Sequence, residues 1–250
     1  MTIDPAFFEA LSSTARRAIA GVADLTPDNK ETAGFDPVTE ADRAAERALR
    51  AQIETHFPKD AIWGEEYGWT REGARRVWSL DPIDGTRAFI CGLPSWAVLV
   101  GVIDEGVHVA GMIDLPDMDA LTIAVDGRTA LNGTPVQTSG CETLADAKIS
   151  TVDPYLFDAS HKPRFERLRE ATRLIRYSLD AMAFAKVASG ELDLAFDAGL
   201  KRHDYDALVA VVRGTGGHIG NWSGGADLSG GDVIAAASEA LYREAVDTLS

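Results

Sequence analysis

Residues 81–86 read Asp-Pro-Ile-Asp-Gly-Thr and follow the short apolar run Val77–Leu80. The apolar run predicts a buried strand that ends at Asp81. The proline stiffens the turn after the strand, so the two aspartate carboxylates can be held close together. The glycine permits a tight backbone, and the next residues favour the start of a helix, whose exposed N–H groups suit a phosphate.

Hard carboxylate oxygens held this closely are typical ligands of Mg²⁺, which binds few carboxylates and then the phosphate of a substrate. Two such ions roughly 3.5–4 Å apart can activate water on one side and stabilise a leaving oxygen on the other. Taken alone, an Asp-x-x-Asp-Gly segment is most often only a turn with aspartates at capping positions. The metal interpretation therefore depends on other acidic residues.

Two further acidic segments occupy comparable places in the predicted elements. Glu65-Glu66 follows a predicted helix, and His203-Asp204 lies at the predicted start of a later helix. Alone, the two glutamates would be a solvated surface pair and Asp204 would be a helix cap. Each segment nevertheless places a carboxylate at a strand end or a helix start. Together the three segments predict a cleft that binds cations.

Other phosphatase and ligand-binding motifs do not fit the spacing of these residues. A haloacid-dehalogenase phosphatase needs Asp-x-Asp-Gly-Thr, whereas two residues separate the aspartates of residues 81–86. Asp117 and Asp119 have the required spacing, but Ala-Leu follows them. An EF-hand needs acids at alternating positions. The glycine cluster at 214–220 misses the dinucleotide-binding fingerprint by one place and ends a helix instead of opening one.

The composition excludes several classes of protein. The 250 residues include 39 Asp and Glu against 24 Lys and Arg, a formal net charge of −15, which argues against a nucleic-acid binder and a polybasic membrane anchor. A hydrophobic fraction of 46% with 25% charged residues is typical of a globular protein. Cys91 and Cys141 are too few for a disulfide framework. The first residues lack a signal peptide and no apolar run is long enough to cross a membrane, so we expect a cytoplasmic protein.

Hydrophobic periodicity predicts two halves of different character, with a seam near residues 135–146. Residues 1–135 should hold two helices and an antiparallel sheet that carries most of the metal ligands, and a capping box from Thr39 to Asp42 should start the second helix. Residues 136–250 should form an α/β half that contributes Asp204. The expected helices are 5–23, 39–57, 163–171, 181–189, 204–213 and 239–249, and the expected strands are 77–80, 96–103, 107–113, 121–125, 147–152, 173–177, 192–196 and 233–237.

Four segments in order resemble the motif set of the inositol monophosphatase family: residues 36–42, Gly64–Glu66, Asp81–Thr86, and Asp204 followed by Gly216-Gly217. The resemblance covers roughly residues 5–240. Residues 84–89, 92–94, 198–200 and 205–208 look most like the histidinol-phosphate phosphatases of this family. The inositol phosphatases usually carry Trp immediately before the last metal aspartate, where this sequence has His203.

The resemblance implies a layered αβαβα sandwich of the α+β or α/β class, a homodimer, and hydrolysis of a small phosphomonoester that depends on two or three Mg²⁺ ions. It implies a first metal site of Glu65, Asp81 and the Ile83 carbonyl. A second metal site would contain Asp81, Asp84 and Asp204, and Glu65 would also support a third ion.

The same resemblance implies roles for the residues around the metals. Thr86 and Glu65 would orient the attacking water, and the amides of Gly85 and Thr86, together with Arg87, would bind the phosphate. Asp36, Thr39 and Asp42 would support the site, and Asp42 is included as a catalytic candidate. The reaction would be an in-line attack of activated water on the phosphate, without a covalent intermediate.

The substrate is the least determined part of this interpretation. L-histidinol phosphate carries an ammonium and an imidazole, so Asp197 and Asp206 are candidates to bind it, although either could be a surface group. Inositol 1-phosphate and an adenosine bisphosphate are the alternative substrates. Arg213 occupies a position where relatives commonly have an acid. A non-enzymatic alternative is a degenerate family member that senses a phosphate ligand or joins an assembly.

Overall fold

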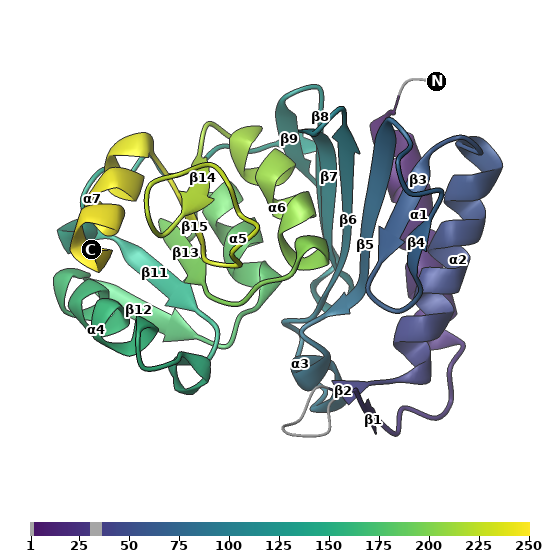
Figure 1. Ribbon diagram of the computed structural model, residues 1–250, viewed down its shortest axis with the longest axis horizontal. Coiled ribbons are helices and arrows are strands. Elements are labelled where there is room, and N and C mark those ends of the chain that lie inside the picture. Colours follow the sequence, from purple (N-terminus) through teal and green to yellow (C-terminus); the bar gives the residue numbers. More distant parts are fainter. Residues whose placement is uncertain (1–2, 31–36) are drawn as a thin grey trace.

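The computed structural model describes residues 3–30 and 37–250, and it arranges them in five layers (Figure 1). Helices α1 and α2 cover one face of an eight-stranded sheet, and α5 and α6 lie between that sheet and a five-stranded sheet. Helices α4 and α7 cover the outer face of the five-stranded sheet. The predicted αβαβα layering of an α+β protein is therefore confirmed.

The helices are α1 (Pro5–Ala20), α2 (Glu40–His56), α3 (Thr86–Ile90), α4 (His161–Ala171), α5 (Ala181–Ala188), α6 (Arg202–Arg213) and α7 (Glu239–Leu249), with 3₁₀ turns at Pro116–Met118, Leu144–Asp146 and Pro154–Leu156. A two-stranded ribbon, β1 (Asp28–Asn29) and β2 (Pro37–Val38), precedes α2. No helix among the described residues is long and apolar enough to cross a membrane. Both cysteines are free.

The eight-stranded sheet has the order β10-β9-β8-β7-β6-β5-β3-β4. Its strands are β3 (Ala61–Gly64), β4 (Gly68–Thr70), β5 (Arg76–Asp84), β6 (Ala97–Asp104), β7 (Val107–Leu115), β8 (Ala120–Val125), β9 (Arg128–Leu131) and β10 (Thr134–Pro135). The antiparallel pairing of β5 to β8 agrees with the predicted meander, but β3 pairs parallel to β5. Because a parallel neighbour ends at the same edge, the residue after β3 lies beside the acidic end of β5.

The predicted first helix, 5–23, is three residues too long. Asp4 caps its start, because Phe7 N donates to Asp4 Oδ1 at 2.9 Å, and Gly21 ends it. The predicted capping box of α2 is present, with the Asp42 carboxylate accepting from Thr39 N at 2.7 Å. Both helices bury their apolar faces on the eight-stranded sheet, in a cluster that includes Phe8, Leu11, Leu49, Ile53 and Trp78.

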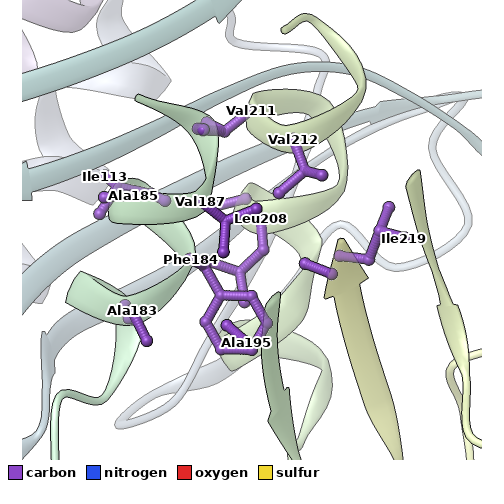
Figure 2. Packing of buried hydrophobic residues seen from close by; sticks show 14 of the residues in the cluster. Ile113, Ala183, Phe184, Ala185, Val187, Ala195, Leu208, Val211, Val212 and Ile219 are labelled. Carbon is purple, nitrogen blue, oxygen red and sulfur yellow. The ribbon is translucent and has the colours of Figure 1, made fainter. Parts of the chain in front are cut away.

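The middle layer packs unusually close to the eight-stranded sheet at α6. A Cβ atom on Gly101 of β6 would lie 2.7 Å from the Asp206 carbonyl carbon, and one on Gly111 of β7 would lie 2.4 Å from Ala207 O. These two glycines therefore admit the backbone of α6 directly onto the sheet. On its other face α6 packs with α5 around Phe184, Leu208 and Val212 (Figure 2). This contact brings the start of α6 to the end of β5.

The five-stranded sheet is mixed and has the order β12-β11-β13-β15-β14. Its strands are β11 (Lys148–Thr151), β12 (Leu174–Tyr177), β13 (Leu194–Asp197), β14 (His218–Asn221) and β15 (Val233–Ala236). β13 and β14 run antiparallel to β15. The sequence did not predict β14, because its glycine and asparagine favour a turn. The first sheet ends at Pro135 and the second begins at Lys148, while the division into two domains stays a prediction.

Candidate metal centre

Four predicted metal ligands meet at the end of β5. Oxygen atoms of Asp81, Asp84 and Asp204 lie within 4.8 Å of one another, and so do ligand atoms of Glu65, Asp81 and His203. Asp81 belongs to both groups. The structure thus brings together the three segments that were singled out in the sequence, although their metal-binding roles stay predictions.

The end of β5 is irregular, and this irregularity presents both aspartates on one side. The sequence predicted that the strand ends at Asp81, but β5 continues to Asp84 with a register shift between the two residues. Ile83 N donates to Asp81 Oδ1 at 3.1 Å, which folds the turn back on its first carboxylate. Ala181 N, at the start of α5, donates to Asp84 Oδ2 at 2.8 Å. Local turn geometry and one distant helix therefore hold the pair.

The turn that carries Glu65 is held by a buried ion pair that the sequence analysis did not predict. Glu46 of α2 is fully buried and accepts from Glu66 N at 2.7 Å, from Tyr67 N at 3.2 Å and from Arg50 Nε at 2.7 Å. A Cβ on Gly64 would lie only 2.0 Å from Glu46 Oε1, so glycine is required there. Helix α2 thereby fixes the turn that carries Glu65. The i, i+4 spacing of Glu46 and Arg50 was a signal for the pair, but not for its target.

Burial and mutual repulsion shift the titration of these acids. Burial, with Glu65 and Asp84 nearby, raises the pKa of Asp81 well above its usual value. Burial and Asp180 do the same to the pKa of Asp84, and burial raises the pKa of Asp204. Burial alone would raise the pKa of Glu65, but His203 and Lys30 outweigh it and lower that pKa. Such a cluster of ionised carboxylates requires compensating positive charge.

Lys30 supplies part of that charge. Its ammonium lies 2.8 Å from Glu65 Oε1 and also pairs with Glu66, so these glutamates are not the solvated pair that their sequence suggests in isolation. Burial would lower the pKa of Lys30, but the two carboxylates raise it. A cation therefore already contacts Glu65, and the carboxylate oxygens of the centre are hard donors of the kind that Mg²⁺ prefers. These residues fit a divalent metal ion.

The predicted phosphate-binding turn comes directly after Asp84, the last residue of β5. Gly85 has a φ of +77° and precedes α3, the short helix that the sequence indicated after the acidic turn. Thr86 Oγ1 donates to Ile83 O at 3.1 Å and lies 3.5 Å from Asp42 Oδ1, and Asp42 also accepts from the Thr39 hydroxyl at 2.6 Å. Thr39, Asp42 and Thr86 therefore form one chain of contacts. Asp36 lies outside the described residues.

A cavity of about 470 Å³ opens over the carboxylates and is also lined by Arg87, His203 and Asp180. Asp180 was not predicted, since its place before α5 is that of an ordinary cap. It has a φ of +46° and makes no capping hydrogen bond from its side chain. Burial raises the pKa of Asp180 to about 6, although Arg87 opposes the shift. Backbone strain and a perturbed acid are common at functional sites.

A second cavity of about 180 Å³ shares Asp84, Asp180 and Asp204 with the first and extends to Asp197. Asp197 is 5% exposed, so it is not a surface group. Burial raises its pKa well above the usual value. Apolar side chains, among them those of Phe184, Leu200 and Leu208, also line this cavity. The site therefore continues into a small chamber with acidic and apolar walls.

Two other sequence candidates lie away from this chamber. Asp206 is 2% exposed and contacts His108 Nε2 and Arg202 Nε, each at 2.8 Å, so it is neither a surface group nor a recognition residue in the cavity. This pairing secures α6 against β7 instead. Arg213 is exposed at the last residue of α6, about 14 Å along the helix from Asp204, and does not line either cavity.

Comparisons with known proteins agree with this geometry. A model of the inositol monophosphatase family matches residues 5–250. The bifunctional phosphatase IMPL2, chloroplastic, of Arabidopsis thaliana is 37% identical over 227 residues, which are 86% of this chain and 66% of that protein. A histidinol-phosphatase of Chlorobaculum parvum is 35% identical over 84% of this chain and 82% of its own length.

Solved structures show the same fold. An inositol monophosphatase from Zymomonas mobilis superimposes with a TM-score of 0.87 at 35% sequence identity, covering 98% of this chain and 96% of that chain. A flexible region at the active site is described for that protein. The similar proteins thus have names that point to two different substrates.

Proposed function

Because this chain belongs to the inositol monophosphatase family, it is a metal-dependent phosphomonoesterase, and we propose that it hydrolyses L-histidinol phosphate with Mg²⁺ as its metal. The observation that carries the substrate proposal is the acidic chamber beside the metal centre, which suits a phosphomonoester with a positively charged organic part. Inositol 1-phosphate is uncharged apart from its phosphate, so it has no positively charged group that could pair with the carboxylates of the chamber.

The metal ions would be held by the carboxylates at the end of β5. Glu65, Asp81 and the Ile83 carbonyl would bind the first ion, Asp81, Asp84 and Asp204 would bind the second, and Glu65 would support a third. Bound divalent ions would neutralise charge at the phosphate and at the leaving oxygen. They would also lower the pKa of water, which makes it a better nucleophile at neutral pH. The raised pKa values of Asp81 and Asp84 support this arrangement, because a cation would offset both the burial and the repulsion that raise them.

The other residues of the site would position the phosphate and the water. The amides of Gly85 and Thr86 lie at the start of α3, and Arg87 lines the same cavity, so all three can face a phosphate. The Thr86 hydroxyl donates its hydrogen to Ile83 O, which leaves its lone pairs to accept a hydrogen bond from water. The lowered pKa of Glu65 keeps that carboxylate ionised, so it can accept a hydrogen bond from the same water and orient it.

Replacing Gly85 by alanine should reduce turnover without unfolding the protein. The added Cβ would lie 3.0 Å from Asp180 Oδ2 at a φ of +77°, so the Asp180 side chain or the turn must shift. We expect a loss of about 1–2 kcal/mol in the free energy of unfolding and at least about a tenfold loss in kcat/KM, because displaced reacting groups are costly. Urea unfolding and phosphate release measure the two effects.

Gly92→Ala is the matched control for this substitution. Gly92 has a φ of +67°, but a Cβ there meets no atom within 4 Å. It should show a similar loss of stability with nearly unchanged kcat/KM. Equal losses of activity in both variants would contradict a specific role for the Gly85 turn.

The substrate proposal rests on two carboxylates outside the candidate metal ligands. Asp180 and Asp197 face the two connected cavities, and burial raises the pKa of both. A buried carboxylate gains most from an ammonium or imidazolium partner, because the pair cancels the charge that burial penalises. The apolar wall from Phe184 and Leu208 suits the faces of an imidazole ring.

Phosphate release should be compared for histidinol phosphate, inositol 1-phosphate and an adenosine bisphosphate, with and without Mg²⁺. We expect histidinol phosphate to have the highest kcat/KM and Asp180→Asn to lower it by roughly 10- to 150-fold, the cost of a lost charge-assisted hydrogen bond. The variant should leave the lower activity toward inositol 1-phosphate within about threefold of its starting value.

Asp153→Asn is a control in the same cavity, since Asp153 lines it but caps a 3₁₀ turn through Tyr155 N at 2.9 Å. A preference of the unchanged protein for inositol 1-phosphate would reject the substrate proposal. Binding of these compounds without any turnover would instead support the ligand-sensor alternative. We also propose a homodimer in the cytoplasm, which sedimentation of the purified protein and cell fractionation would test.

A further inference from the structure

We propose that His203 is a nitrogen ligand of the first metal ion, so that the first site binds a first-row transition metal such as Zn²⁺ more tightly than a site of oxygens alone would, while the reaction of the proposed function still uses Mg²⁺. The inference rests on the metal centre of the proposed function and adds to it a residue that the sequence did not assign as a ligand. It also concerns a different property, the choice of metal, and it is tested by measurements that do not require turnover.

The position of the imidazole carries the argument. His203 is in the first turn of α6, immediately before Asp204, and is only 5% exposed. Its Nε2 atom lies 3.9 Å from Glu65 Oε1 and 3.2 Å from Asp204 Oδ1. A ring nitrogen of His203 and oxygens of Glu65 and Asp81 lie within 4.8 Å of one another, a spacing that one ion can bridge.

The contacts of the ring place one of its nitrogens in the metal centre. Nδ1 is buried and has no hydrogen-bond partner among the described residues. Nε2 contacts two carboxylates of the metal centre, those of Glu65 and Asp204. His161, in contrast, has a carboxylate at each nitrogen, with Nδ1 2.8 Å from Asp158 and Nε2 3.2 Å from Asp232. Both nitrogens of His161 thus have partners outside the metal centre, whereas Nε2 of His203 lies among the candidate metal ligands.

A nitrogen ligand changes which metal the site prefers. Imidazole suits Zn²⁺ and Fe²⁺, whereas Mg²⁺ takes oxygen ligands almost exclusively. A neutral imidazole also adds a donor without adding to the repulsion among Glu65, Asp81 and Asp204. The second metal site, Asp81, Asp84 and Asp204, contains only oxygen and should keep the preference of Mg²⁺ for such sites.

The direct test is pulsed electron paramagnetic resonance of Mn²⁺ bound to the full-length protein. We expect a ¹⁴N coupling from a directly bound imidazole, and we expect it to change to a ¹⁵N pattern when histidine is selectively labelled. This measurement needs no variant, so it stands even if substitution of His203 destabilises the fold. Absence of nitrogen coupling at the first site, with Mn²⁺ bound there, would overturn the proposal and leave His203 as a hydrogen-bond donor to Asp204.

Calorimetry of His203→Gln provides the second measurement. The Zn²⁺ affinity should fall at least about tenfold, the lower end of what is lost even when a residue that only supports a metal ligand is removed. The Mg²⁺ affinity should change by less than about threefold. Equal losses for the two metals would contradict nitrogen ligation, because a merely structural role would affect both.

His161→Gln is the matched control, since it removes a histidine with two carboxylate neighbours outside the cavities. It should leave the nitrogen coupling and both affinities unchanged. Failure of this inference is separable from failure of the proposed function. A protein without nitrogen ligation can still hydrolyse histidinol phosphate with Mg²⁺, whereas a protein with nitrogen ligation but no turnover of any tested phosphomonoester would reject the substrate proposal alone.

Discussion

Asp81→Asn is expected to lower phosphatase turnover by more than about a hundredfold while the fold survives. Asp81 is the residue that both groups of candidate metal ligands share. Substitutions of residues that only support a metal ligand typically cost 10- to 100-fold, so loss of a shared ligand should cost more. Asp84→Asn removes one member of the second group and is expected to have an effect of the same order.

The fold should survive because asparagine has nearly the same shape and removes a buried, repelled charge. Burial and the neighbouring acids raise the pKa of Asp81, so its ionised form is unfavourable in the absence of a cation. Phosphate release in Mg²⁺ and thermal unfolding, followed by circular dichroism, measure the two properties.

Asp117→Asn is a suitable control for this prediction. Like Asp81, Asp117 is followed closely in the sequence by a second aspartate, Asp119. Its carboxylate, however, accepts a hydrogen bond from Trp96 Nε1 at 2.8 Å and lines neither cavity. This variant should retain near-normal turnover. Near-normal turnover by Asp81→Asn would remove the metal role from the end of β5.

The candidate ligands could be found from the sequence because each lies at the end of a locally recognisable element. An apolar run ends at Asp81, and a helical period begins at Asp204. Such signals span only a few residues, so they survive whatever the tertiary packing is. The αβαβα layering, by contrast, came from the family resemblance and not from the local patterns.

Residues that act through long-range contacts could not be found in this way. Asp180 reaches the centre only because Ala181 N bonds to Asp84, 97 positions earlier in the chain. Glu46 reads as an ordinary helix-surface acid until the turn after β3 packs on it. Asp206 was predicted wrongly for the same reason, since it was expected at the surface or in the cavity. Gly101 lets α6 come so close to the sheet that Asp206 is buried.

Short strands were the weakest part of the predicted fold. β3 and β4 contain four and three residues, with glycines at their junction, and β14 contains a glycine and an asparagine. Period-two alternation is not readable over so few residues, and their pairing is decided by neighbouring strands. The parallel pairing of β3 with β5 could therefore not be predicted, although it is what places Glu65 beside Asp81.

Without divalent metal, the acidic centre should make the protein lose stability as pH rises, and metal should reverse this. Asp81, Asp84 and Asp180 have pKa values raised by burial and by neighbouring acids. The folded state then binds more protons than the unfolded state, so the free energy of unfolding falls with rising pH. For Asp180 the fall begins near the ordinary value of 3.8 and is complete above about 6. For Asp81 and Asp84 the raised pKa values act in the same direction.

A comparison with a variant separates the effect of the acidic centre on stability from the effects of the other carboxyl groups. Asp180 alone would contribute at most about 3 kcal/mol, less the part that solvent screens. Since other carboxyls, such as Asp104, have lowered pKa values and act in the opposite direction, the wild type must be compared with Asp84→Asn from pH 4 to 8 in a chelator. The variant should gain stability relative to the wild type as pH rises.

Mg²⁺ at a hundred times its dissociation constant should stabilise the wild type by about 2.7 kcal/mol and the variant by less. A difference between the two proteins that is independent of pH would show that the folded state does not raise the pKa of Asp84. Equal stabilisation by Mg²⁺ would show that Asp84 does not help to bind the cation.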